Sequence, residues 1–300
     1  MADHQGTFDA VSQTSYVDSV DDQGRTTLHN SILVDDIELI RDLLEQGANP
    51  GIQDNDGDTP LILAARLHVE QHADRFVLKK KRDELIATLC DSKGDLNWMA
   101  QNHRGKTVFH EAAYSGRVFL FRMYFKGHGQ SRALESVMND GVNAHQLNPL
   151  QEACYRGQFS VVKCLLQFGL GRGQPGSLAL KKACQQHRSR IVDLLLAEGI
   201  RSPSSDEGGT MLHIALDNMP LEGSDRLRDV VETVRVLLKW GVNPNQRDKR
   251  GSTPSHTLVC KLSGTERYII NLHFPPNFTH FVNKTRLLRF HLILLLFIVI

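Results

Sequence analysis

A pattern that returns about every 33 residues constrains this chain more than any other feature. The segment DQGRTTLH at residues 22–29 opens one unit, and DNDGDTPL at residues 54–61 opens the next, so that Thr26 and Thr59 are 33 residues apart. A repeat of this length forms a supersecondary unit that cannot bury its apolar face alone and must stack on its neighbours. The chain is therefore expected to fold as one continuous solenoid.

Later copies keep the pattern with variation. The fifth lacks the Thr-Pro opening, and the seventh starts but is not completed. These openings lie at residues 102–113, 148–154, 178–184, 209–215 and 248–256. The sequence predicts about six repeats and a partial seventh.

Each unit reads as helix, turn, helix and hairpin. Thr59 is suited to cap the first helix with its hydroxyl, and Pro60 to take the first helical position, where a missing N–H costs nothing. Leu-Leu pairs such as Leu165-Leu166 give the second helix an apolar stripe. A left-handed helix end is expected at the glycines that follow, which are Gly47, Gly169, Gly199 and Gly241.

These motifs resemble the ankyrin-repeat family over roughly residues 20–258. The resemblance implies an all-α ankyrin-repeat solenoid of helix-turn-helix units with β-hairpin loops. It also implies protein–protein binding on a concave surface of hairpin tips and first helices, without intrinsic catalysis. Hydrogen bonding between repeats is implied for the histidines of the opening motif, which are His29, His110, His213 and His256.

The expected domain organisation has three parts. Residues 1–20 are a flexible N-terminus, residues 21–258 the ankyrin-repeat domain, and residues 259–300 a non-repeat tail with a short hydrophobic end. That end is a run of nine apolar residues at 292–300, whereas a bilayer-spanning helix needs about 20. A membrane anchor is therefore the minority interpretation, beside that of an aggregation-prone chain end.

Composition excludes several classes of protein. Thirty-five basic and 34 acidic residues leave a net charge of +1, so no global field recruits nucleic acid. The five cysteines form no Cys-x-x-Cys pair, and the N-terminus lacks the features of a signal peptide. We expect reduced thiols in an intracellular protein of the cytoplasm, with the nucleus as an alternative location.

Three stretches depart from the repeat pattern, and two of them hold candidate chemistry. Insertions lie at residues 65–83 and 218–224, and the third unit loses the pattern between residues 116 and 144. Within the first insertion, His68 and His72 share a helix face but lack a third metal ligand, so solvent-facing histidines are favoured. The basic run at residues 79–82 fits either a nuclear import signal or, as we favour, a solvated helix.

No sequence motif predicts catalytic residues, a cofactor or a metal. Partner-binding residues are expected instead at the hairpin tips, around the turn glycines, and at the ends of first helices, where aromatic and arginine anchors occur. The second tip is acidic and the third and seventh are basic, which offers local complementarity. The predicted set is Asp22, Gln23, Arg25, Asn55, Asp56, Asp58, His103, Arg104, Lys106, Tyr114, Tyr155 and Arg156, with Lys249 and Arg250 at the seventh tip.

The function expected from these features is that of an intracellular adaptor or scaffold that binds other proteins. Two alternatives stay open. One is a membrane-tethered ankyrin-repeat protein anchored by its hydrophobic C-terminus. The other is a substrate-recognition subunit of a ubiquitin ligase, which would need a recruitment box that the tail does not display.

Overall fold

The computed structural model describes residues 16–67, 75–91, 96–129, 132–139, 143–201, 210–219 and 226–261. Fourteen helices account for most of these residues, and the only extended pairing among them is an isolated antiparallel bridge between Val20 and Thr26. The predicted all-α repeat fold is confirmed. The helices are α2 (Thr27–Leu33), α3 (Ile37–Glu45), α4 (Pro60–Arg66), α5 (Arg75–Cys90), α6 (Val108–Ser115), α7 (Val118–His128), α8 (Arg132–Asn139), α9 (Pro149–Arg156), α10 (Phe159–Gln167), α11 (Gln174–Gln185), α12 (Ser189–Ala197), α13 (Met211–Asp217), α14 (Leu227–Lys239) and α15 (Pro254–Lys261).

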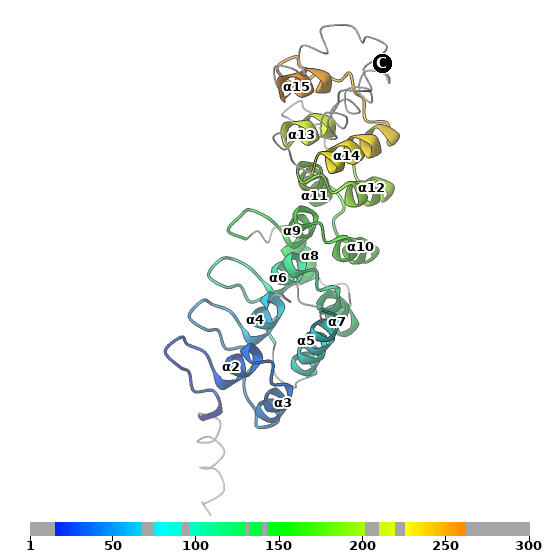
Figure 1. Ribbon diagram of the computed structural model, residues 1–300. Coiled ribbons are helices and arrows are strands. Elements are labelled where there is room, and N and C mark those ends of the chain that lie inside the picture. The colour runs from blue at the N-terminus through cyan, green and yellow to red at the C-terminus, as the bar shows by residue number, and fades with distance from the viewer. Residues whose placement is uncertain are drawn as a thin grey trace, which may run out of the picture. The chain divides into compact units, whose positions relative to one another are not determined.

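The chain groups into two compact units, Met1–Glu152 and Ala153–Ile300, with the boundary inside α9. In the first unit α2 packs on α4 and α4 on α6, while α3 packs on α5 and α5 on α7. Hairpin loops project from the α2, α4 and α6 side, and the α3, α5 and α7 layer lies on the other side (Figure 1). The second unit stacks α11, α13 and α15 in one series and α10, α12 and α14 in the other.

Small side chains let the first helices approach one another. Every residue of α4 from Pro60 to Ala65 is buried, and Ala112 and Ala113 of α6 are fully buried beside it. Dense packing of this kind leaves no room for extra methylene groups, so a larger side chain here would overpack the helix interface. The core of each unit therefore lies between its two helix layers.

Helix ends form as the residues predict. The Thr59 hydroxyl accepts a hydrogen bond from the Ile62 N–H at 3.3 Å, and Pro60 is the first residue of α4. The glycines after the second helices adopt positive φ, which only glycine adopts without steric cost. Their φ angles are 90° for Gly47, 73° for Gly169, 79° for Gly199 and 75° for Gly241.

Parts of the stretches that depart from the repeat pattern lie within the described residues. Helix α5 runs for 16 residues, so residues 75–82 of the first insertion lengthen the second helix of the second repeat. The third unit keeps a second helix, α7, whose buried face is built from Leu120, Phe121, Tyr124 and Phe125 instead of a Leu-Leu pair. His68, His72, most of the 218–224 insertion and the hydrophobic tail lie outside the described residues. Within the described part of the chain, no helix is long and apolar enough to span a bilayer.

Candidate partner-binding surface

One turn is built repeatedly at the hairpin tips. In the second repeat the Asp54 carboxylate oxygen Oδ1 accepts hydrogen bonds from the Asp56 and Asp58 N–H groups, each at 2.9 Å. The Asp54 N–H donates to the Asp58 carbonyl at 2.9 Å, and the Gly57 N–H donates to the Asp54 carbonyl at 2.8 Å. A short acceptor side chain that bonds its own downstream backbone stabilises such a turn.

The same turn recurs at four more positions. In each, an Asp or Asn side chain accepts from the N–H groups two and four residues later, at 2.8–3.2 Å. The first of these carboxylates has a lowered pKa, because it accepts bonds from the Asn30 side chain and from the backbone. The pKa of Asp248 is also lowered, by backbone hydrogen bonds. The residues that begin these turns are Asp21, Asn102, Asn143 and Asp248.

Consecutive tips of the first unit are bonded to one another. The Asn55 N–H donates to the Gln23 carbonyl at 3.0 Å, the His103 N–H to the Asp56 carbonyl at 3.0 Å, and the Ala144 N–H to the Arg104 carbonyl at 2.9 Å. We call the four tips, residues 21–25, 54–58, 102–106 and 143–147, the tip ladder. From the second tip on, all five N–H groups of each tip are used within the protein. From the second tip on, the tip ladder therefore has no backbone N–H group to donate to a partner.

The fourth residue of each turn needs a left-handed backbone. Glycine occupies it at Gly24, Gly57, Gly105 and Gly251, with φ between 67° and 77°. The fourth tip departs from this pattern, because Gln146 takes the same place with φ 57°. A Cβ atom on Gly57 would come within 2.9 Å of the His103 backbone nitrogen, so the ladder bond itself requires glycine there.

Histidines three residues after the helix cap join neighbouring repeats. The Thr26 N–H donates to Nδ1 of His29 at 3.2 Å, so this nitrogen carries no proton and the neutral ring is protonated on Nε2. Nε2 lies 3.1 Å from the Asp58 carbonyl of the next repeat and donates to it. His213 makes the same link to the Ser252 carbonyl at 3.0 Å. Bonding between repeats is confirmed for these two histidines.

Most of the predicted binding residues lie where the sequence placed them. Those at the solvent-facing apices are exposed, and those next to the helices are partly buried. Tyr155, Arg156, Lys249 and Arg250 belong to the second unit and the other ten to the first. The exposed residues are Asp22, Gln23, Asn55, Asp56, His103, Arg104, Arg156, Lys249 and Arg250, and the partly buried ones are Arg25, Lys106, Tyr114 and Tyr155.

Asp58 is a correction to the sequence-based set. Its side chain is fully buried, where Oδ2 forms an ion pair with Arg66 and Oδ1 accepts a bond from Asn102 Nδ2 at 2.8 Å. Burial raises the pKa of its carboxyl group. Asp58 is the fifth residue of the turn and directly precedes the helix cap Thr59. Its bond to Asn102 joins two repeats, and its buried side chain is not accessible to a partner.

Three aspartates of the second tip come together, but the protein engages two of them. Carboxylate oxygens of Asp54, Asp56 and Asp58 lie within 4.8 Å of one another. Asp54 accepts its two backbone bonds and lies 3.8 Å from Arg25 Nε, while Asp58 is held by Arg66 and Asn102. The cluster is thus a structural junction between tips, with only the Asp56 side chain exposed.

Tyr114 lies beside a buried ion pair. Lys106 Nζ is 3.0 Å from the Glu111 carboxylate and 5.0 Å from the centre of the Tyr114 ring. In the second unit, the Arg156 guanidinium lies 5.4 Å from the Tyr155 ring. Cation–π contacts of this kind orient the rings. The Tyr114 and Tyr155 rings are therefore partly buried, and each is oriented by a neighbouring cation.

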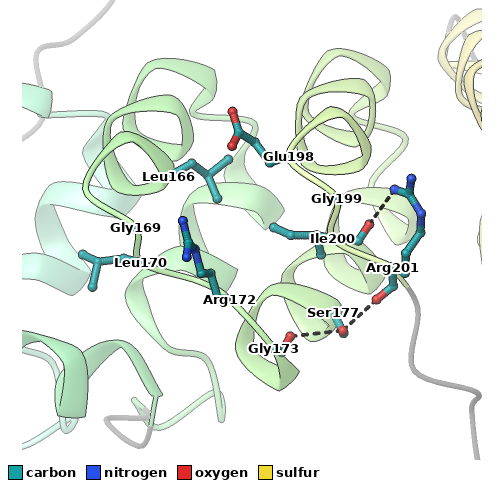
Figure 2. A pocket seen from close by; sticks show the side chains of 10 residues that line it. All are labelled: Leu166, Gly169, Leu170, Arg172, Gly173, Ser177, Glu198, Gly199, Ile200 and Arg201. Carbon is teal, nitrogen blue, oxygen red and sulfur yellow. Dashed lines mark hydrogen bonds between the residues drawn. The ribbon is translucent and has the colours of Figure 1, made fainter.

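The second unit contains a cavity of about 390 Å³ between the ends of α10 and α12 (Figure 2). Leu166, Leu170 and Ile200 form its apolar lining, with Arg172 and Glu198 as charges of opposite sign. Arg201 is occupied, since its Nη1 donates to the Leu196 carbonyl at 2.7 Å. The lining is a small apolar surface with one basic and one acidic side chain, and it pairs no nucleophile with a base.

The described cysteines behave as apolar residues. Cys154, Cys164 and Cys184 are buried, Cys90 is partly buried, and none of the four is in a disulfide. Burial raises the pKa of Cys90 to about 12 and raises the pKa values of Cys154 and Cys184 as well. Because the thiolate is the reactive form, burial lowers the reactivity of these last three thiols.

Comparison with known proteins agrees with this architecture. A family model described as "Ankyrin repeats (3 copies)" matches residues 28–128, 109–206 and 150–248. The chain belongs to the ankyrin-repeat family. Ankyrin repeats are protein–protein interaction modules, and the coarse functional prediction from the sequence is supported to that extent.

Two similar proteins share about a quarter of their aligned residues with this chain. The chain is 24% identical over 287 residues to the E3 ubiquitin-protein ligase KEG of Arabidopsis thaliana, which covers 83% of this chain and 17% of that protein. It is 23% identical over 247 residues to the ankyrin repeat protein L371 of Acanthamoeba polyphaga mimivirus, covering 80% of this chain and 28% of that one. The chain thus spans less than a third of the length of either relative.

Solved ankyrin domains share the fold. The ankyrin repeat domain of Bcl-3, described as a member of the IkappaB protein family, aligns with a TM-score of 0.55 at 19% identity, covering 83% of this chain and 98% of that one. The ankyrin repeat domain of human ASB11 aligns with a TM-score of 0.57 at 19% identity, covering 84% and 100%. At this identity the likeness shows the fold alone.

Sequence reasoning missed one ankyrin tip. The fourth tip presents His145 and Gln146 to solvent, but no glycine marks its turn. A signal was present, because an Asp or Asn stands five residues before the Thr or Asn that caps five of the first helices. The pairs are Asp21 and Thr26, Asp54 and Thr59, Asn102 and Thr107, Asn143 and Asn148, and Asp248 and Thr253.

Proposed function

We propose that this protein is an adaptor or scaffold that captures a protein partner through the exposed side chains of the tip ladder and has no catalytic activity of its own. The observation that carries the proposal is the set of hydrogen bonds between consecutive tips, which fixes the backbone under every exposed side chain.

A fixed surface favours binding for a physical reason. Association has to order whatever side chains and loops are mobile beforehand, and a preformed surface reduces that cost. Four tips are held in register by three backbone bonds, and each tip is closed by its own Asp or Asn. Partner residues can then dock against side chains whose positions are already set.

We also propose a cytoplasmic location. None of the four described cysteines is in a disulfide, which supports a reducing compartment. Nuclear import through the basic run at residues 79–82 is less favoured, because the run lies within α5 and Arg82 is bonded to Asp35 at 3.0 Å. Microscopy of the tagged full chain tests this, and accumulation in the nucleus that depends on Lys80 and Lys81 would reverse the order of preference.

Affinity purification from cell lysate tests the main proposal. The full chain is compared with a ladder variant, Gln23→Ser, Asp56→Ser and Arg104→Ser, which changes the third residue of three tips. The control, Asp42→Ser, Glu45→Ser and Lys163→Ser, changes exposed residues of second helices. Proteins held by the chain and the control but lost from the ladder variant, with equal circular dichroism, are expected. Equal retention by all three would refute the ladder as the binding surface.

One relative favours a second candidate, recognition of substrates for ubiquitination. The similarity to a protein named E3 ubiquitin-protein ligase covers 83% of this chain. In that case a protein captured by the tip ladder would be ubiquitinated in cells expressing the chain, and the Gln23, Asp56 and Arg104 variant would abolish the modification. Capture without any change in ubiquitination would leave the adaptor function and exclude this one.

A further inference from the structure

Charges near the tip ladder fall into two groups. Those beside the helices are paired within the protein, through Arg25 with Asp54 at 3.8 Å, Lys106 with Glu111 at 3.0 Å, and Arg66 with Asp58. These pairs are neutral overall and are partly or fully buried. They hold the tips in place and offer no net charge to a partner.

Charges at the apices are different. Asp22, Asp56 and Arg104 are exposed, and none of the three forms an ion pair with another described residue. Asp22 and Asp56 lie on the first and second tips, and Asp21 adds a further exposed carboxylate to the first. Arg104 lies on the third tip, and the exposed residues of the fourth tip carry no acid. The exposed apices of the ladder are therefore negative on the first and second tips, positive on the third, and without Asp, Glu, Lys or Arg on the fourth.

The order of these charges is fixed by the backbone. Asp56 and Arg104 each occupy the third position of their turns, and each offers its carbonyl to the next tip, at 3.0 Å for Asp56 and 2.9 Å for Arg104. The tips cannot change place or slide past one another without breaking these bonds. The change of sign consequently falls at one place, between the second and third tips.

We propose that the tip ladder binds an extended protein segment whose own charges are divided to match, with basic residues against the first and second tips and acidic residues against the third. This inference rests on the proposed function and specifies the partner's chemistry. Backbone recognition by strand addition is disfavoured because the tip N–H groups are already bonded. Side-chain charge is what the ladder has to offer.

Recognition by exposed charges sets the orientation of the bound segment more than it raises the affinity. An exposed ion pair contributes a factor of about two to five in affinity, is weakened by salt, and penalises the wrong register through like-charge contact. Several pairs with one required order distinguish a segment with separated charges from one of equal composition with mixed charges.

Fluorescence anisotropy with two synthetic 20-residue peptides of equal composition tests the proposal. In the block peptide lysines fill one half and glutamates the other, and in the alternating peptide they are interspersed. The full chain at low salt is expected to bind the block peptide at least fivefold more tightly, with the difference lost at high salt. Equal affinities, or no binding of either peptide, would overturn the inference.

Two variants locate the effect. Arg104→Glu gives the first three tips exposed charges of one sign and should abolish the preference for the block peptide. Arg250→Glu makes the same change at the same position of the seventh hairpin turn, outside the ladder, and should leave the preference intact. A preference that survives Arg104→Glu would overturn the inference. If lysate proteins still depend on the ladder while the peptides bind equally, the proposed function stands and only the charge division fails.

Discussion

A methyl group added to a glycine of the tip turns would clash with the next repeat at one site and meet open space at another. Gly57 and Gly251 have nearly the same φ, 77° and 76°, and both are the fourth residue of the turn. A Cβ on Gly251 would meet nothing within 4 Å, whereas one on Gly57 would approach the His103 nitrogen. Alanine pays the same cost for a left-handed backbone at both sites. The difference in stability between the two alanine variants therefore measures the close packing of adjacent tips.

Alanine at these two glycines should therefore destabilise unequally. Gly251→Ala is expected to lower the free energy of unfolding by about 1 kcal/mol from the left-handed backbone alone. Gly57→Ala should lower it by about 2 kcal/mol or more, because the neighbouring backbone also has to move. Urea unfolding of both variants measures this, and equal losses would mean that the second and third tips are not tightly joined.

The buried histidines predict how stability depends on pH. Burial lowers the pKa of His29 and of His187, with hydrogen bonds to carbonyl groups acting in the opposite sense. Below about pH 6.5 the two histidines are protonated in the unfolded chain but stay neutral in the folded chain. Their contribution to the free energy of unfolding is therefore full above pH 6.5 and is lost as pH falls. Asp58, with its raised pKa, acts in the opposite sense in acid.

We expect the free energy of unfolding to fall between pH 7.5 and 5.5, with a slope of up to about 1.4 kcal/mol per pH unit for each histidine. His29→Gln should be less stable at pH 7.5 but should show a shallower slope. Urea titrations at the two pH values provide the comparison. An unchanged slope in the variant would show that His29 does not titrate differently in the folded chain.

At the scale of helices, the cap and its partner three residues later act as a pair. Thr107 donates its N–H to His110 Nδ1 at 3.1 Å, and in the fourth repeat Asn148 donates its N–H to Gln151 Oε1 at 3.2 Å. Asn148 Oδ1 also accepts from the Gln151 N–H at 2.8 Å. Asparagine and glutamine thus reproduce the geometry that threonine and histidine create elsewhere.

Exchanging this pair for the common one gives a direct test. The double variant Asn148→Thr, Gln151→His keeps an acceptor for both backbone N–H groups, so its free energy of unfolding is expected to stay within about 0.5 kcal/mol of the original. Asn148→Ala and Gln151→Ala each remove one acceptor and should each cost about 1 kcal/mol. Urea unfolding measures all three variants, and a double variant that loses as much as either alanine variant would contradict the equivalence of the two pairs.

Much of this local structure could be predicted from residue types. Thr59 and Pro60 mark a helix start, and the glycines after second helices mark helix ends, because these preferences depend on one or two residues. Asp58 could not be placed in this way, since its burial depends on Arg66 and on Asn102 of the next repeat. The fourth tip was missed because Gln146 adopts a backbone that sequence reasoning assigns to glycine.

At the scale of the whole molecule, the repeat period predicted the architecture before any element was placed. Stacked units contact only their neighbours, so a solenoid follows from periodicity and the Leu and Ala positions. The surface chemistry does not follow from the period. It depends on which apical charges remain unpaired, as with Asp56 and Arg104, and that is decided by contacts between residues of different repeats.

Site-specific photo-crosslinking shows whether partners contact the apices of the tip ladder. A benzophenone side chain placed at Gln23, Asn55 or His103 of the full chain should form covalent adducts with a captured partner in cells. The same group at Arg41, an exposed residue of α3 in the same unit, should not. Adducts from Arg41 with none from the three tips would contradict the account, because binding would then use the second-helix layer.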